Sequence, residues 1–110
     1  MSQKNSNLIF FGTSEEAVYA LEAMHDRGII PSLIVTPIDR PAGRHQELKA
    51  PLAKVWAEKN KIPIFQSEKI DSKAIEFIAQ KNADIFIVVG YGKILPKELI
   101  DLPKYKTLNI

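Results

Sequence analysis

Residues 85–89 form the apolar run Ile85-Phe86-Ile87-Val88-Val89, and Gly90-Tyr91-Gly92 follows it directly. An apolar run without polar alternation indicates a strand buried on both faces, as in a parallel sheet. Similar unbroken runs stand at residues 8–11 and 33–35, and further apolar runs stand at 62–65 and 108–110. The sequence therefore predicts five short strands at these positions.

Segments with apolar residues at helical spacing lie between these runs, at residues 14–27, 51–60, 72–81 and 95–100. Gly28 fits the end of the first helix, and Asp71 or Ser72 fits the start of the third. Alternating strands and helices predict an α/β fold, a doubly wound, Rossmann-like parallel sheet with helices on both faces. Residues 36–50 are expected to form a long irregular connection, which in a compact domain is usually functional or mobile.

Composition limits the classes of function. A chain of 110 residues with 45% hydrophobic residues has room for one core, and a net charge of +2 does not indicate general binding to nucleic acid or membrane. The absence of cysteine excludes disulfides and thiolate metal sites, and His25 and His45 are far apart, so we expect no metal. Residues 1–7 are polar and lack an apolar signal segment. We expect a cytoplasmic protein with no membrane span.

The last predicted strand begins near Thr107 and the chain ends at Ile110. Ligands of doubly wound sheets bind beyond the carboxyl ends of the strands. We therefore expect residues 1–7 to be a tail and residues 8–110 to be an incomplete domain, truncated after about five strands. An uncovered edge strand favours pairing with another chain, so we expect self-association through the exposed sheet edge.

The first strand continues into Gly12-Thr13-Ser14-Glu15-Glu16. Only one glycine is present, so the G-x-G-x-x-G pattern of dinucleotide-binding proteins is missing. Thr13 and Glu16 match a capping box, and two carboxylates in the first turn would repel a pyrophosphate. The residues therefore argue against NAD binding, although Gly12 and Thr13 can still line a cleft.

The 36–50 connection contains two arginines, Arg40 and Arg44, on either side of Pro-Ala-Gly. Two guanidinium groups on a stiff loop can bind phosphates or a carboxylate in a bidentate manner. The alternative is a solvated surface loop in which Asp39 pairs with Arg40 or Arg44. The spacing does not decide between these two interpretations.

Two further features stand at the ends of predicted strands. Gly90 and Gly92 flank Tyr91, and glycines at such a place let a ligand approach the backbone closely. Tyr91 alone is equally consistent with packing in a turn, but the two glycines favour a pocket for a flat heterocycle. Asn109 stands among apolar residues, and a buried amide at the carboxyl end of a strand needs partners or donates to an oxyanion.

Together these segments resemble the methionyl-tRNA formyltransferase family. The matching stretches are residues 11–13, 39–44, 88–96 and 108–110, in the order and at the spacing of that family. The resemblance implies the N-terminal part of a Rossmann-like formyltransferase catalytic domain. It implies transfer of a formyl group from 10-formyltetrahydrofolate to the amino group of methionine on initiator tRNA.

The resemblance also implies roles for residues. In the family an Asn, matched by Asn109, and a His stabilise the oxyanion that forms when the amine attacks the formyl carbon, and an Asp assists proton transfer. The matching His and Asp lie beyond Ile110, so we expect the 110-residue chain to be inactive alone. The pterin of the folate would be held by Tyr91, Gly92, Lys93, Ile94, Leu95 and Pro96. The substrate and the tRNA acceptor end would be contacted by Gly12, Thr13, Arg40 and Arg44.

Two departures and two alternatives remain. Gly90 stands where the family usually has alanine, and His45-Gln46-Glu47 follow Arg44 where the family is more basic. One alternative is a sugar-nucleotide N-formyltransferase with the same folate chemistry, against which the Arg-Pro-Ala-Gly-Arg loop argues. The other is a non-catalytic module that binds folate or a nucleotide, which the reading frame after Ile110 would test.

Overall fold

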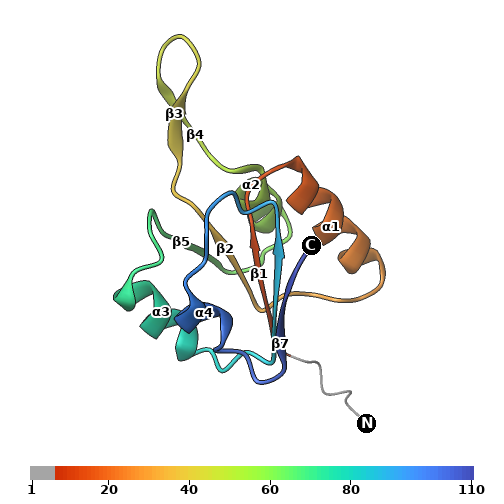
Figure 1. Cartoon of the computed structure of the whole chain (residues 1–110). Helices are drawn as coiled ribbons and strands as arrows, with labels where there is room; N and C mark the ends of the chain where they lie inside the picture. Colours follow the sequence, from red (N-terminus) through yellow and green to blue (C-terminus); the bar gives the residue numbers. More distant parts are fainter. Residues whose placement is uncertain (1–6) are drawn as a thin grey trace.

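A parallel sheet of five strands forms the centre of the protein (Figure 1) in a computed structural model, which describes residues 7–110. The strands follow the spatial order β5-β2-β1-β6-β7, and all four neighbouring pairs are parallel. Their bounds are β1 (Leu8–Gly12), β2 (Leu33–Thr36), β5 (Ile64–Gln66), β6 (Ile85–Val89) and β7 (Lys106–Asn109). The five strands predicted from the apolar runs are confirmed.

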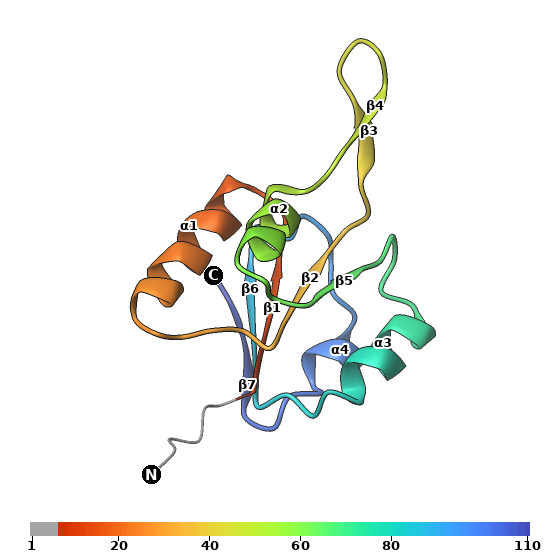
Figure 2. The same cartoon turned by 180° about the vertical axis from the view of Figure 1, so that it is seen from behind.

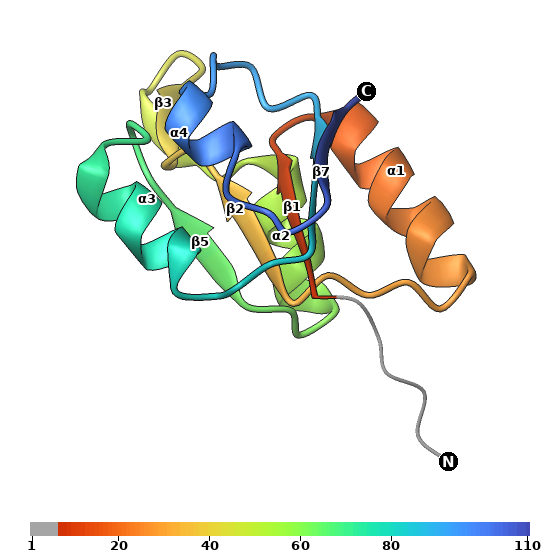
Figure 3. The same cartoon turned by 60° about the horizontal axis from the view of Figure 1, so that its bottom comes forward.

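Helices cover both faces of this sheet, as expected for a doubly wound fold. One face is covered by α1 (Glu15–Asp26) and α2 (Leu52–Lys59), and Figure 2 shows α2 in front of the strands. The opposite face is covered by α3 (Ser72–Ala79) and α4 (Lys97–Ile100), and Figure 3 shows α4 in front of the sheet and α2 behind it. The predicted α/β fold class is therefore confirmed.

Side-chain alternation along the central strand divides the core into two layers. Phe10 packs with α1 and α2, whereas Ile9 and Phe11 pack with α3 and α4. All three side chains are fully buried. A strand in contact with helices on both faces has no solvent-facing position, which is why its sequence shows no polar alternation.

The predicted helix ends at Asp71 and Gly28 are also confirmed. The Asp71 carboxylate accepts a hydrogen bond of 3.0 Å from the backbone N–H of Ala74, as an N-cap should. Gly28 follows Arg27, the C-cap residue of α1, with φ of +76°, the left-handed conformation that ends many helices.

The connection 36–50 is not irregular, and this expectation was wrong. Strands β3 (Arg40–Ala42) and β4 (Glu47–Lys49) form an antiparallel hairpin that projects from the body of the protein (Figure 1). The turn between them contains Gly43 and Gln46, both with positive φ. Because every residue from 40 to 49 is exposed, no buried face imposes an alternating pattern that would have indicated strands. We call residues 40–49 the arm.

The predicted capping box at α1 is wrong as well. The helix begins at Glu15 with Ser14 as its N-cap, and the Ser14 side chain makes no capping hydrogen bond. The Thr13 hydroxyl instead donates to the carbonyl of Tyr91 at 2.7 Å. The Thr13 side chain therefore makes a tertiary contact, although local sequence reasoning assigned it to the start of the helix.

The N-terminal boundary falls at the edge of the described residues. Of the predicted tail, residues 1–6 lie outside the described part of the chain. The backbone N–H of Asn7 donates to the Asp84 carboxylate at 2.9 Å. Within residues 7–110, no helix combines the length and the apolar character needed to cross a membrane.

Candidate functional site

A pocket of about 440 Å³ opens at the carboxyl edge of the sheet. Its walls come from the turn after β1, the segment from Pro37 into the arm, the start of α2 and the turn after β6. These segments are far apart in sequence. They meet because parallel strands place all their carboxyl ends at the same edge, which is where ligands of such sheets bind. The volume is in the usual range for small-molecule sites, roughly 300–1,000 Å³.

The pocket brings together five of the residues that the sequence marked as candidates: Thr13, Arg40, Tyr91, Gly92 and Lys93. Thr13 and Arg40 had been assigned to the substrate or tRNA, and the other three to the folate. Members of both predicted groups therefore share one cavity. Such sharing is what a group transfer between two bound molecules requires.

Two hydrogen bonds join the turn after β1 to the turn after β6. The backbone N–H of Thr13 donates to the carbonyl of Gly90 at 3.0 Å, and its hydroxyl donates to the carbonyl of Tyr91 at 2.7 Å. The carbonyl of Thr13 also accepts from the backbone N–H of Ala53 at the start of α2, at 3.1 Å. Thr13 thus ties three walls of the pocket to one another.

The Tyr91 side chain is part of the core and does not present its ring to the solvent. It is 3% exposed and meets Phe11 edge-on, with ring centroids 5.9 Å apart. Burial raises the pKa of its phenol above the usual value, and its hydroxyl has no hydrogen-bond partner among the described residues. A ligand in the pocket therefore meets mainly the backbone of this turn.

The two glycines beside Tyr91 differ in what surrounds them. At Gly90, with φ of +58°, an added Cβ would lie 2.5 Å from the Ser14 Oγ. At Gly92, with φ of +85°, an added Cβ would meet nothing within 4 Å. The glycine in place of the family's usual alanine at position 90 is therefore a closely packed site, whereas position 92 faces open space.

The base of the arm is held by Asp39, whose carboxylate accepts hydrogen bonds from two other elements. Gln66 donates at 2.8 Å from the end of β5, and Lys54 donates at 3.1 and 3.2 Å from α2. These hydrogen bonds, first from Gln66 and then from Lys54, lower the pKa of Asp39 below its usual value. The pairing of Asp39 with Arg40 or Arg44 that belonged to the surface-loop alternative is therefore wrong.

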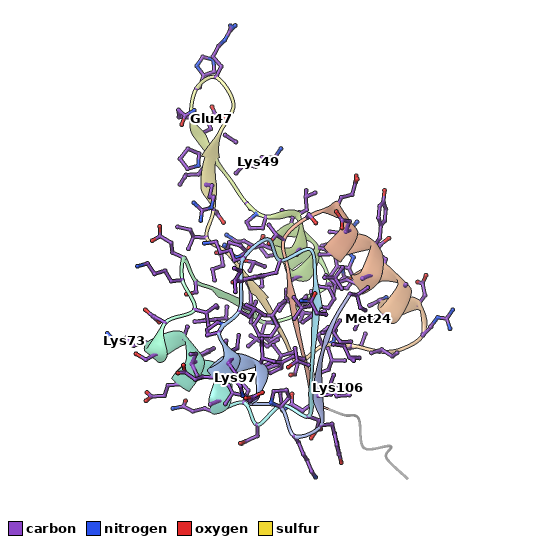
Figure 4. All side chains as sticks on the ribbon, viewed as in Figure 1. Met24, Glu47, Lys49, Lys73, Lys97 and Lys106 are labelled. Atoms are coloured by element: carbon purple, nitrogen blue, oxygen red, sulfur yellow. The ribbon has the colours of Figure 1, made fainter. Side chains whose placement is uncertain are left out.

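Positive charge dominates the charged groups of the pocket. Arg40, Lys49 and Lys93 line it, and none of the described lining residues is an Asp or Glu. The arm itself reaches outward: Figure 4 shows Glu47 and Lys49 away from the core side chains, with Lys49 closer to the body. A cavity of this kind favours an anionic ligand such as a carboxylate or phosphate.

Some predicted site residues do not line the pocket. Gly12 is the buried last residue of β1, where an added Cβ would lie 2.6 Å from the Cβ of Ala17 in α1. Arg44 is in the exposed turn of the arm. The remaining residues outside the pocket lining are Ile94, Leu95, Pro96 and Asn109.

Asn109 is exposed, so the expectation of a buried amide was wrong. It stands on β7, the edge strand, and pairs in register with Val88 of β6. Its apolar neighbours in sequence, Leu108 and Ile110, are exposed too, at 40% and 81%. An exposed apolar edge strand cannot be distinguished from a buried strand by composition alone.

Sequence reasoning missed Lys54, Gln66 and the lining residues Pro37 and Leu52. Lys54 was on a predicted helix and Gln66 at the end of a predicted strand, but nothing local links either residue to Asp39. The contact of Gln66 depends on parallel pairing of β2 and β5, which places Gln66 opposite Thr36, whereas Lys54 reaches Asp39 from α2. Within residues 7–110, no cluster of His, Asp and Glu could hold a metal ion.

Comparison with known proteins identifies the family of this chain. A family model described as formyl transferase matches residues 5–110. The chain belongs to the formyl transferase family. Curated relatives named methionyl-tRNA formyltransferase include those of Sulfurihydrogenibium sp. (strain YO3AOP1), 42% identical over 94% of this chain, and Thermodesulfovibrio yellowstonii, 43% identical over 96%. The one of Acidobacterium capsulatum is 44% identical over 94% of the chain.

This formyl transferase chain spans about a third of the length of these relatives: 34%, 35% and 34% of the three proteins. Among solved structures, glycinamide ribonucleotide transformylase 1 from Geobacillus kaustophilus is similar with a TM-score of 0.63 and 18% identity. That likeness covers 96% of this chain and 57% of the other, and it supports the fold.

Proposed function

We propose that this chain forms part of a methionyl-tRNA formyltransferase, in which it supplies the turn that binds the formyl donor and the arm that contacts tRNA. The donor would be 10-formyltetrahydrofolate, the acceptor the amino group of methionine on initiator tRNA, and the location the cytoplasm, where translation begins. The observation that carries the proposal is the shared pocket, where Arg40 of the arm and the 91–93 turn line one cavity.

The residues of this pocket fit a folate-type donor in two respects. The open space beside Gly92 lets a flat ring approach the backbone of the turn. Lys49 and Lys93 supply positive charge for the carboxylates that such a donor carries. The donor contributes the formyl group, and the chain's residues bind and orient it.

The arm is suited to contact with the phosphates of an RNA end. Arg40 lines the pocket, whereas Arg44 stands in the turn between β3 and β4, so the two arginines occupy different positions along the projecting hairpin. Phosphate contacts of this kind position an RNA without reading its sequence, and they weaken with salt.

Asn109 is proposed as the amide that donates to the formyl oxygen as negative charge develops on it. Its strand is paired with β6, which carries the donor-binding turn, and its exposed amide is accessible from solvent. The amine nitrogen forms the new bond to the formyl carbon, the bond from that carbon to the donor nitrogen breaks, and a proton passes from the amine to the departing nitrogen.

Calorimetry with 5-formyltetrahydrofolate, a stable analogue of the donor, tests the assignment of the turn. The key variant is Gly92→Trp, which fills the open space beside the turn. Its matched control is Gly28→Trp, because Gly28 has a similar φ of +76° and equally open surroundings after α1. Saturable binding that Gly92→Trp abolishes and Gly28→Trp retains is the expected result. A parent chain that binds no analogue, or equal loss in both variants, would contradict the assignment.

A further inference from the structure

Asp39 stands at the point where the chain leaves the body of the protein. Pro37 is buried, Asp39 is half-buried, and every residue from Arg40 to Lys49 is exposed. Within residues 7–110, the Gln46 side chain of the arm donates a hydrogen bond to the Gly43 carbonyl, so this contact stays inside the arm. The arm therefore depends on its base for a defined direction.

That base is connected by the Asp39 carboxylate to two rigid elements. Gln66 is in register with Thr36 at the ends of paired strands, and its amide donates to both the Asp39 carboxylate and the carbonyl of Pro37, at 2.8 and 3.0 Å. Lys54 belongs to α2, which is anchored by fully buried Ala53. Asp39 is thus tied to the sheet on one side and to a helix on the other.

The ion pair between Asp39 and Lys54 is more sheltered than an ordinary surface pair. Their side chains are 30% and 20% exposed, against 58% and 87% for Asp101 and Lys97, which pair on α4 and just after it. Shielding from solvent strengthens an ion pair, whereas open surface pairs contribute little. The Lys97–Asp101 pair is therefore a natural control: the same chemistry, away from the arm.

We propose that Asp39 is a positioning residue whose bonds to Lys54 and Gln66 fix the direction of the arm and hold Arg40 at the rim of the pocket. Without the carboxylate, the arm would move independently of the sheet. Ordering it again on contact with a ligand would then oppose binding. That this ligand is the acceptor end of an RNA rests on the proposed function.

The test compares Asp39→Ala with Asp101→Ala by ¹⁵N relaxation of the whole 110-residue chain. In the parent, we expect order parameters of about 0.85 for the backbone amides of β3 and β4, as in rigid structure. Asp39→Ala should lower them below about 0.6, with values in the five-stranded sheet unchanged. Asp101→Ala should leave the order parameters of β3 and β4 unchanged. Asp39→Asn keeps an acceptor for Gln66 but loses the ion pair, so its order parameters in the arm should lie between those of Asp39→Ala and Asp101→Ala.

A second readout connects the arm to its ligand. A minihelix with an initiator acceptor stem should bind Asp39→Ala about tenfold more weakly than Asp101→Ala, which corresponds to about 1.4 kcal/mol. Unchanged order parameters in Asp39→Ala would overturn the positioning role, whatever the RNA result. If Asp39→Ala lowers the order parameters of the arm but the parent chain binds no minihelix, the positioning role of Asp39 stands and the proposed RNA contact is rejected.

Discussion

The Thr13 hydroxyl donates a hydrogen bond of 2.7 Å to the carbonyl of Tyr91, across 78 positions of sequence. This bond joins the turn that begins the first crossover to the turn that the family resemblance assigns to the folate. It is partly buried, so water does not readily replace it. The geometry of the pocket thus depends on a contact that neither segment specifies locally.

Thr13→Val should therefore destabilise the protein, because it keeps the shape of the side chain and leaves the Tyr91 carbonyl without its donor. We expect a loss of about 1–2 kcal/mol in the free energy of unfolding, measured by urea denaturation. Thr107→Val is the matched control, since the Thr107 hydroxyl also donates to a backbone carbonyl, that of Ile100, but in an exposed setting. Equal losses in the two variants would show that burial of the Thr13 bond has no effect.

Gly90→Ala and Gly92→Ala should differ in cost, although both residues have positive φ. At Gly92 the added Cβ meets open space, so only backbone strain of about 1 kcal/mol is expected. At Gly90 it also meets the Ser14 Oγ, and we expect about 2–3 kcal/mol in total. Thermal or urea unfolding measures both.

The double variant Ser14→Ala with Gly90→Ala isolates the steric contribution. Removing the Ser14 hydroxyl from the Gly90→Ala variant should recover most of the extra stability that Gly90→Ala loses relative to Gly92→Ala. A double-mutant cycle reports this recovery as coupling between Ser14 and Gly90. A cycle without coupling would mean that the backbone conformation alone accounts for the cost at position 90.

Tyr91→Phe should stabilise the protein by about 1 kcal/mol, because it removes a buried hydroxyl that has no partner among the described residues. The pH dependence should change too. Burial raises the pKa of Tyr91 in the folded state, so above about pH 10 the unfolded chain loses this proton while the folded chain retains it. The stabilisation that comes from the raised pKa of Tyr91 is therefore present below that pH and is lost as the pH rises through the folded pKa.

Unfolding free energies measured from pH 8 to 11 check this behaviour. The fall above about pH 10 should be smaller in Tyr91→Phe than in the parent. Tyr19→Phe is the control, since Tyr19 is 66% exposed. If the free energy of unfolding falls equally at alkaline pH in Tyr91→Phe and in Tyr19→Phe, Tyr91 is not the source of the fall.

The uncovered edge of β7 should cause the 110-residue chain to self-associate, because within residues 7–110 β7 has a partner strand on one side only. Leu108→Lys places a charge on this edge and should shift the chain towards monomer in sedimentation at high concentration. Ile30→Lys, at a similarly exposed apolar residue in the loop before β2, should not. A parent that sediments as a monomer at every concentration would refute this prediction.

Much of the architecture followed from the sequence alone. The unbroken apolar runs at residues 8–11, 33–35 and 85–89 predicted strands buried on both faces, and helical spacing between them predicted the doubly wound sheet. These signals are reliable because a strand that contacts helices on both faces must be apolar at every position. The glycine-flanked Tyr91 and the two arginines of the 36–50 connection likewise marked two segments whose residues line the pocket.

Only the tertiary structure decided how side chains find partners across the chain. It placed the Thr13 hydroxyl on Tyr91 instead of in a capping box, joined Asp39 to Lys54 and Gln66 instead of to an arginine, and left Asn109 exposed on an edge strand. The physical reason is common to all three. Periodicity and local propensity report what a segment prefers, whereas a hydrogen bond between distant residues forms where the packed sheet brings donor and acceptor together.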